Sequence, residues 1–204
     1  MKAAASRDSL TWVLWSCQIA LAAAALGAFG YCAFVLADTW TFQAEASHRF
    51  DHVSLQPAPL SAPRATAMDG WMARLEIPRL GFSVVVGEGT DETTLRRAAG
   101  HIAGTALPGR SGNVGIAGHR DTLFRPLRNI RQDDVILLTT LQSKYQYRVV
   151  STKIVNPSDV TVLDSGEADI LTLVTCYPFY FVGPAPDRFI VRAERVPQKR
   201  GDGI

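Results

Sequence analysis

The sequence predicts an all-β domain, either a sandwich or a barrel, that follows a single transmembrane helix. Two observations support this prediction. From Trp71 to Val196, short runs rich in β-branched and aromatic residues alternate with breaks of glycine, proline and aspartate, and only one short helical pattern occurs among them. From Ser9 to Ala37 there is no charged residue, and about 20 apolar helical residues already span a bilayer. Many short strands with few helices are typical of all-β folds.

Residues 9–37 are predicted to be an uncleaved membrane anchor. Aromatic rings tend to settle at the level of the lipid headgroups, and four of them lie near the two ends of this stretch: Trp12, Trp15, Tyr31 and Trp40. A cleavable signal peptide is the alternative, because residues 35–37 resemble a small-residue cleavage site. The apolar region of a signal peptide is normally only about 7 to 15 residues long, which favours the anchor.

The charges around this stretch predict its orientation. Lys2, Arg7 and the amino terminus outweigh Asp8, and no lysine or arginine follows until Arg49. Positive charge favours the cytoplasmic side, so residues 1–8 are expected in the cytoplasm. We therefore expect a single-pass protein of the cytoplasmic membrane, in contact with membrane lipid, whose main domain is extracytoplasmic.

Residues 38–70 are predicted to be a stalk and a linker. Residues 39–53 are polar with spaced apolar positions, which is compatible with a continuing helix. Prolines 57, 59 and 63 then interrupt a stretch of alanines and serines, which makes it a poor candidate for a helix or a central strand. One folded domain is expected at residues 71–197, followed by a short tail at residues 198–204.

Within the folded domain, apolar patterning predicts the elements in order. Residues 73–77 alternate between apolar and polar side chains, as in a strand with one buried face, and residues 92–99 indicate a short helix. The predicted strands cover residues 73–77, 82–86, 113–117, 135–139, 145–155, 170–175 and 188–196.

Charge and residue clustering exclude two classes of partner. The net charge of +2 arises from 21 basic and 19 acidic side chains that are scattered along the chain, so no nucleic-acid partner is expected. There is no CxxC motif, no HExxH motif and no concentrated carboxylate group, so neither a metal nor a cofactor is predicted.

The three cysteines divide between the anchor and the folded domain. Cys17 and Cys32 lie in the apolar stretch, where a free thiol behaves as a small hydrophobic group. Cys176 is then alone in the exported domain, where a single thiol is a liability unless it is buried or used in chemistry.

Three residues at strand ends could form a chemical site. The strand at residues 171–176 ends in Cys176, the strand at residues 113–117 leads through a glycine to His119, and Arg188 opens the last strand. A thiolate attacks carbonyls, an imidazolium protonates a leaving amine, and a guanidinium stabilises an oxyanion. Each residue alone also has a plain explanation: a structural cysteine, a solvated histidine and a surface arginine.

The motif around the cysteine resembles a known family. Residues 172–176 read Thr-Leu-Val-Thr-Cys, which is similar to the TLxTC signature of sortases, and His119 and Arg188 fall where that family places its other two catalytic residues. Residues 118–122 and 171–179 are most similar to class D sortases, including those of Gram-negative bacteria. The resemblance implies an eight-stranded β-barrel with one or two short helices and an N-terminal transmembrane anchor.

The resemblance also implies an activity. Cys176 would cleave a sorting signal of the LPxTG type through a thioester, with His119 as proton donor and Arg188 as the stabilising cation. Thr175 would lie beside the substrate, and the backbone amide of Tyr177 would support the oxyanion. The implied partners are a protein with a C-terminal sorting signal and an amine acceptor, which is a peptidoglycan precursor or a protein.

Neighbouring residues and competing functions remain open at this point. Asp121 is expected either to orient His119 or Arg120 behind the site or to cap the following turn, and Arg120 is expected to play a similar supporting role. His101 is interpreted as a loop histidine that does not line the site. The alternatives to a transpeptidase are a cysteine endopeptidase, which uses the same residues with water as acceptor, and a catalytically silent, membrane-tethered binding module.

Overall fold

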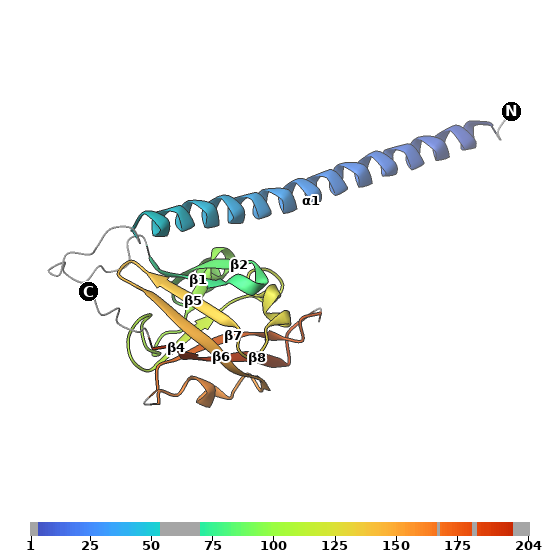
Figure 1. Ribbon diagram of the computed structural model, residues 1–204. Helices are drawn as coiled ribbons and strands as arrows, with labels where there is room; N and C mark the ends of the chain where they lie inside the picture. The colour runs from blue at the N-terminus through green and yellow to red at the C-terminus, as the bar shows by residue number, and fades with distance from the viewer. Residues whose placement is uncertain (1–3, 54–69, 167, 181–182, 198–204) are drawn as a thin grey trace. The chain divides into compact units, whose positions relative to one another are not determined.

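The computed structural model describes residues 4–53, 70–166, 168–180 and 183–197 (Figure 1). The chain forms two compact units, residues 1–42 and residues 43–204. Residues 4–42 of the first unit are part of one long helix, and the second unit contains the β-domain.

Helix α1 extends from Ala4 to Val53 and contains the stretch predicted as an anchor. Its segment Thr11–Glu45 has a mean hydropathy of 2.2 and no buried residue in its apolar window. At 1.5 Å per residue, these 35 residues extend about 50 Å, which exceeds the hydrocarbon thickness of a bilayer. The helix is therefore long and apolar enough to cross a membrane. The linker predicted at residues 54–69 lies outside the described residues.

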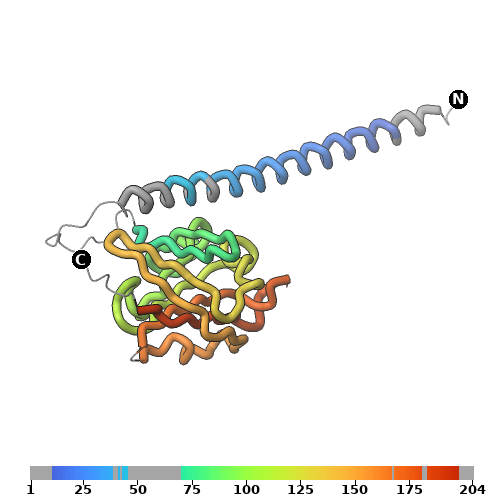
Figure 2. The backbone as a smooth tube through the Cα atoms, viewed as in Figure 1, coloured from blue at the N-terminus to red at the C-terminus, as the bar shows by residue number. Residues whose placement is uncertain are grey.

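The β-domain is a closed barrel of eight strands, which confirms the predicted all-β class. The strands follow the order β1-β2-β3-β4-β7-β8-β6-β5 around the barrel, and Figure 2 traces the path of the chain through them. The pairs β2–β3 and β4–β7 are parallel, and the other neighbours are antiparallel. The strands are β1 (Trp71–Ile77), β2 (Phe82–Glu88), β3 (Ala99–His101), β4 (Asn113–Ala117), β5 (Val135–Thr140), β6 (Lys144–Val155), β7 (Ile170–Tyr177) and β8 (Asp187–Arg195).

Alternate side chains of the strands fill the inside of the barrel. Because successive side chains of a strand point to opposite faces, each strand contributes every second residue to one apolar core. The fully buried members include Leu75, Ile77, Val84, Val86, Val114, Ile116, Leu138, Leu171, Leu173 and Val191. The opposite faces of the same strands remain free to carry polar and reactive groups.

Short helices connect the strands. Helix α2 (Glu92–Arg97) begins at Asp91, whose carboxylate accepts from the backbone N–H groups of Thr93 and Thr94. The hydroxyl of Thr93, together with the backbone N–H and the hydroxyl of Thr94, donates hydrogen bonds that hold the pKa of Asp91 well below its usual range. The remaining helical turns are 3-10 helices: η1 (Pro78–Leu80), η2 (Arg125–Asn129) and η3 (Val160–Leu163).

Strand β3 is the one strand of the barrel that the sequence did not predict. The helix expected to reach residue 99 ends at Arg97, and residues 99–101 pair with both β2 and β4. Gly100 permits this close packing, since a Cβ there would lie 2.2 Å from the carbonyl oxygen of Gly89. His101 is consequently a buried strand residue, not a loop residue, and is only 2% exposed.

Candidate active site at the ends of β4, β7 and β8

Parallel pairing of β4 and β7 brings two of the predicted catalytic residues together. The register ends with Ala117 opposite Val174. The pairing continues one step further, because the N–H of Gly118 donates to the Val174 carbonyl at 3.1 Å. The hydroxyl of Thr175 also donates to the Gly118 carbonyl at 2.7 Å. His119 directly follows Gly118, and Cys176 directly follows Thr175.

Antiparallel pairing of β7 and β8 brings in the third residue. Cys176 and Arg188 are directly opposite each other across the two strands, a position in which Cβ atoms lie about 4.5–5.5 Å apart. Cys176 and Arg188 are half-buried and His119 is exposed. The three residues thus lie at the ends of neighbouring strands in the order β4, β7, β8, with Cys176 on the middle strand.

The Arg188 side chain is held by its own loop. Its Nη1 donates to the carbonyl of Asp187 at 3.0 Å and to that of Ala185 at 3.4 Å. Among the described residues, no hydrogen bond joins this guanidinium to Cys176. A guanidinium carries five N–H donors, so most of its donors remain available for a substrate that enters the site.

Arg120 ties the loop between β7 and β8 to the segment that carries His119. Its side chain is buried, Nη1 donates to the Pro178 carbonyl at 3.0 Å, and Nη2 donates to the Gly183 carbonyl at 3.0 Å. Its Nε lies 3.4 Å from a carboxylate oxygen of Asp121. Of the alternatives left open for Asp121, the contact with Arg120 is therefore the one observed. Arg120 therefore binds two points of the loop that links Cys176 to Arg188, at Pro178 and at Gly183.

The two residues expected to contact substrate have structural partners. Thr175 is 2% exposed and hydrogen-bonded to Gly118, so its side chain holds β4 against β7. The ring of Tyr177 packs against Phe179 and Phe189, with centroid distances of 6.1 and 6.3 Å. The contacts expected between these two residues and a substrate stay predictions.

His101 is the last residue of β3, and none of its described hydrogen bonds involves His119, Cys176 or Arg188. Its Nε2 lies 3.0 Å from the Ala106 carbonyl, and its Nδ1 lies 3.2 Å from the Glu88 carboxylate. The imidazole therefore fastens the loop that follows β3. This agrees with the expectation that His101 does not line the site.

Sequence reasoning missed a polar bridge at the start of β4, the end of the strand away from His119. The amide of Asn113 donates to the carbonyls of Val162 and Asp164 at 3.1 and 3.3 Å. Its carbonyl oxygen accepts from the Thr172 hydroxyl at 2.7 Å. Asn113 thus fastens the η3 loop across the outer face of β4 and β7. The only signal in the sequence is a polar residue at the start of an apolar strand.

Sequence reasoning also missed a hollow on the outer face of the barrel. It has a volume of about 170 Å³ and is lined by residues of β6, β8 and the η3 segment, which are Ser151, Lys153, Val155, Asp159, Thr161, Val162, Ile190 and Arg192. Finding it from the sequence would require knowing the register between β6 and β8.

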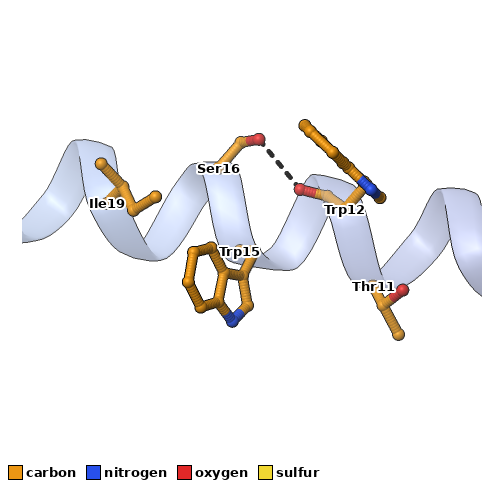
Figure 3. Close-up of a pocket in the computed structure, with 5 residues that line it drawn as sticks. All are labelled: Thr11, Trp12, Trp15, Ser16 and Ile19. Atoms are coloured by element: carbon orange, nitrogen blue, oxygen red, sulfur yellow. Dashed lines mark hydrogen bonds between the residues drawn. The ribbon is translucent and has the colours of Figure 1, made fainter.

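A second hollow, of about 470 Å³, lies along α1 (Figure 3). Its lining residues come from two turns of one helix, and the hydroxyl of Ser16 donates to the Trp12 carbonyl at 2.9 Å. None of the lining side chains is a nucleophile with a neighbouring base. The exposed rings of Trp12 and Trp15 suit contact with lipid headgroups.

Comparison with known proteins identifies the family. Residues 75–196 match the family model described as the sortase domain. The chain is 37% identical over 123 residues to Sortase D of Bacillus subtilis, covering 60% of this chain and 62% of the relative. It is 31% identical over 140 residues to Sortase A of Listeria monocytogenes, covering 65% and 63%. The chain therefore spans less than two thirds of the length of these curated relatives.

Solved structures support the same conclusion. The Clostridium perfringens Sortase D5 transpeptidase superposes with a TM-score of 0.61 at 27% identity, covering 77% of this chain and 97% of that one. Sortase A from Corynebacterium diphtheriae superposes with a TM-score of 0.60 at 27% identity, covering 81% and 87%. With the barrel, the TLxTC motif at the end of β7 and a family match over most of the barrel, this chain belongs to the sortase family.

Proposed function

We propose that this protein is a membrane-anchored cysteine transpeptidase that cleaves an LPxTG-like sorting signal and transfers the cleaved protein to an amine. The observation that carries the proposal is the strand pairing that sets Cys176 between His119 and Arg188. Membership of the sortase family adds independent support. The residues and the chemistry they perform are the points to be tested.

In the first half-reaction, the Cys176 thiolate attacks the carbonyl carbon of the signal's threonine. The resulting oxyanion is stabilised by donors of Arg188 and by the backbone N–H of Tyr177. The C–N bond then breaks, the amine leaves with a proton from His119, and the substrate remains attached to sulfur as a thioester.

In the second half-reaction, an acceptor amine attacks the thioester carbonyl. The amine gives its proton to the now neutral His119, the C–S bond breaks, and the Cys176 thiolate is released beside a new amide. His119 is exposed, so an acceptor can approach it from solvent. We propose that a peptidoglycan precursor or a second protein supplies this amine at the outer surface of the cytoplasmic membrane.

The apolar helix supports the proposed location. Segment Thr11–Glu45 is long enough to act as the anchor, and the basic residues before it favour a cytoplasmic N-terminus. The barrel would then meet sorting signals that emerge on the outer side of the membrane. Protease protection of the barrel in intact spheroplasts would contradict this orientation.

The full chain in detergent provides the direct test. It is incubated with an LPxTG-type peptide and with diaminopimelate or triglycine, and the products are identified by mass spectrometry. We expect cleavage after threonine, an amine-linked product and a thioester on Cys176. All three should disappear in Cys176→Ala and persist in a Cys17→Ala, Cys32→Ala double variant, in which Cys176 is the only thiol.

The other outcomes distinguish the competing functions. A product formed only with water, at every amine concentration, would identify a cysteine endopeptidase. The absence of a thioester with any signal peptide would contradict the proposal and favour a silent binding module.

A further inference from the structure

Helix η2 presents two arginines on one exposed face. A 3-10 helix has about three residues per turn, so side chains three positions apart lie one above the other. Arg125 and Arg128 have this spacing and are both exposed, whereas Leu127 between them is fully buried in the core. The Cα atoms of the two arginines therefore lie about 6 Å apart along the helix axis, and both side chains leave η2 on the same outer side.

This face begins close to His119. The N–H of Phe124 donates to the His119 carbonyl at 2.9 Å, which closes a tight turn between the two residues. The Phe124 ring lies directly against Gly118, since a Cβ at Gly118 would be 2.8 Å from it. Arg125 follows Phe124 at one Cα spacing of about 3.8 Å. A side chain as long as that of arginine can therefore reach a molecule that contacts His119.

Arg128 also reaches the loop that follows Cys176. Its Nη1 donates to the hydroxyl oxygen of Tyr180 at 2.6 Å, and its Cζ lies 5.5 Å from the centroid of that ring. Tyr180 is 76% exposed, so both groups lie at the surface. A guanidinium carries five N–H donors, and a neutral hydroxyl does not cancel its charge. Arg128 thus retains charge and donors for a ligand that lies beside this loop.

Two of the three carboxylates in residues 119–134 are engaged by cations from other elements. An oxygen of Asp134 accepts from Nη2 of Arg79, in η1, at 2.6 Å. An oxygen of Asp133 lies 3.8 Å from Nη1 of Arg148, in β6. These ion pairs offset both carboxylates without drawing on the charge of the η2 face.

The third carboxylate belongs to Asp121, which lies 3.4 Å from Nε of Arg120. The Asp121 side chain is 68% exposed, so it would oppose a bound anion, although the charge of Arg120 offsets its own. Among the described residues, no ion pair joins Arg125 or Arg128 to a carboxylate. The excess positive charge beside His119 is therefore that of Arg125 and Arg128.

The acceptor amine must come to this side of the site, because His119 takes its proton in the second half-reaction. Groups attached close to the amine then lie beside η2. A guanidinium matches a carboxylate through two parallel N–H donors. Two neighbouring guanidinium groups therefore suit an acceptor that carries a carboxylate next to its amine. In diaminopimelate, each amine shares its carbon with a carboxylate.

We propose that Arg125 and Arg128 bind a carboxylate of the amine acceptor, and that they select acceptors in which this carboxylate and the reacting amine share a carbon. This inference rests on the proposed function, because it uses His119 to locate the acceptor amine. The preferred acceptor is then a peptidoglycan precursor with a free amino-acid end, such as that of diaminopimelate. The side-chain amine of a lysine within a protein lacks this carboxylate and is disfavoured.

Aminolysis of the thioester measures this selection. The full chain in detergent is incubated with an LPxTG-type peptide and with either diaminopimelate or its diamide, at several acceptor concentrations. The amine-linked products are quantified by mass spectrometry, and the ratio of the two kcat/KM values is compared between the wild-type chain and its variants. Because the two acceptors are the same throughout, the different basicity of their amines cancels in this comparison.

Substitutions on η2 identify the residues responsible. Arg125→Gln and Arg128→Gln should each lower the ratio roughly two- to fivefold at low salt, which is typical of exposed ion pairs. The double charge reversal to Glu should lower it further, and these effects should shrink as salt rises. Asp121→Asn should raise the ratio, because it removes the opposing carboxylate. Lys153→Gln removes one exposed positive charge from β6 and should leave the ratio unchanged.

Every outcome decides a claim. If the double Gln variant still forms the thioester and keeps the wild-type ratio, the carboxylate recognition is overturned and the proposed function stands. An equal fall with both acceptors also keeps the ratio, and it would show that η2 supports the fold or the chemistry instead. If the wild-type chain forms no thioester with any signal peptide, the proposed function falls, and the acceptor site falls with it.

Discussion

The segment before His119 has no room for a side chain, and Gly118→Ala tests this directly. An added Cβ would lie 2.8 Å from Cγ of Phe124 and 2.9 Å from both Cδ atoms. The Phe124 ring is fully buried, and Gly118 is fastened to β7 at Val174 and Thr175. Either the ring or the end of β4 must therefore move.

The cost follows from these contacts. Overpacking a filled core typically destabilises a protein by about 1–3 kcal/mol. With a urea dependence of about 2 kcal/mol per molar, the unfolding midpoint should fall by about 0.5–1.5 M. Because His119 follows directly, we also expect kcat for thioester formation to fall about tenfold or more, since small misplacements of catalytic groups are costly.

Urea unfolding followed by far-UV circular dichroism measures the first effect, and quenched-flow acylation measures the second. Gly166→Ala is the matched control, because its added Cβ meets nothing within 4 Å. Phe124→Leu replaces the ring with a smaller side chain. Combined with Gly118→Ala, it should recover part of the lost stability and part of the lost acylation rate. If Gly118→Ala unfolds at the same midpoint as Gly166→Ala and acylates at the wild-type rate, the packing explanation is wrong.

Three further changes test other parts of the barrel. Arg120→Lys keeps the charge, but a single ammonium group cannot bind both the Pro178 and the Gly183 carbonyl. We therefore expect kcat to fall about tenfold while KM and the melting temperature change little. A change in KM alone would contradict the idea that Arg120 positions the loop after Cys176. Burial raises the pKa of Tyr147 to about 12. Neutral Tyr147 therefore stabilises the folded state fully below about pH 10, and this stabilisation is lost as the pH rises towards 12. In Tyr147→Phe, the unfolding midpoint should depend less on pH in this alkaline range. Hydrogen bonding from Arg79 lowers the pKa of Asp134, so Asp134→Asn should lower the unfolding midpoint at pH 7, and this difference should shrink as the pH falls below the usual pKa range of an aspartate.

Most of the strands could be predicted, because a strand with one buried face shows an alternation of apolar and polar residues in the sequence. Strand β4 matches its predicted bounds, and β6 differs by one residue from its prediction. Strand β3 left no such pattern. Its three residues are Ala, Gly and His, none of which favours strands, and they pair only because Gly100 allows a close approach.

The site was predictable only in part, because strand pairing is not a local property. Cys176 and His119 could be recognised from the TLxTC motif and the family resemblance. The sequence alone did not show that the Thr175 side chain is turned inward, or that Arg120 binds the loop after Cys176. The alignment of Lys153 and Arg192 depends on the register of β6 and β8, which follows from barrel closure.

The order of strands around the barrel affects when the thiol becomes reactive during synthesis and export. His119 leaves β4 early, but β5 and β6 must be threaded before β7 delivers Cys176 beside it, and Arg188 arrives only with β8. If the proposed function is correct, a nascent chain that has emerged only as far as residue 176 should therefore be inactive, because Arg188 is still missing from its place opposite Cys176.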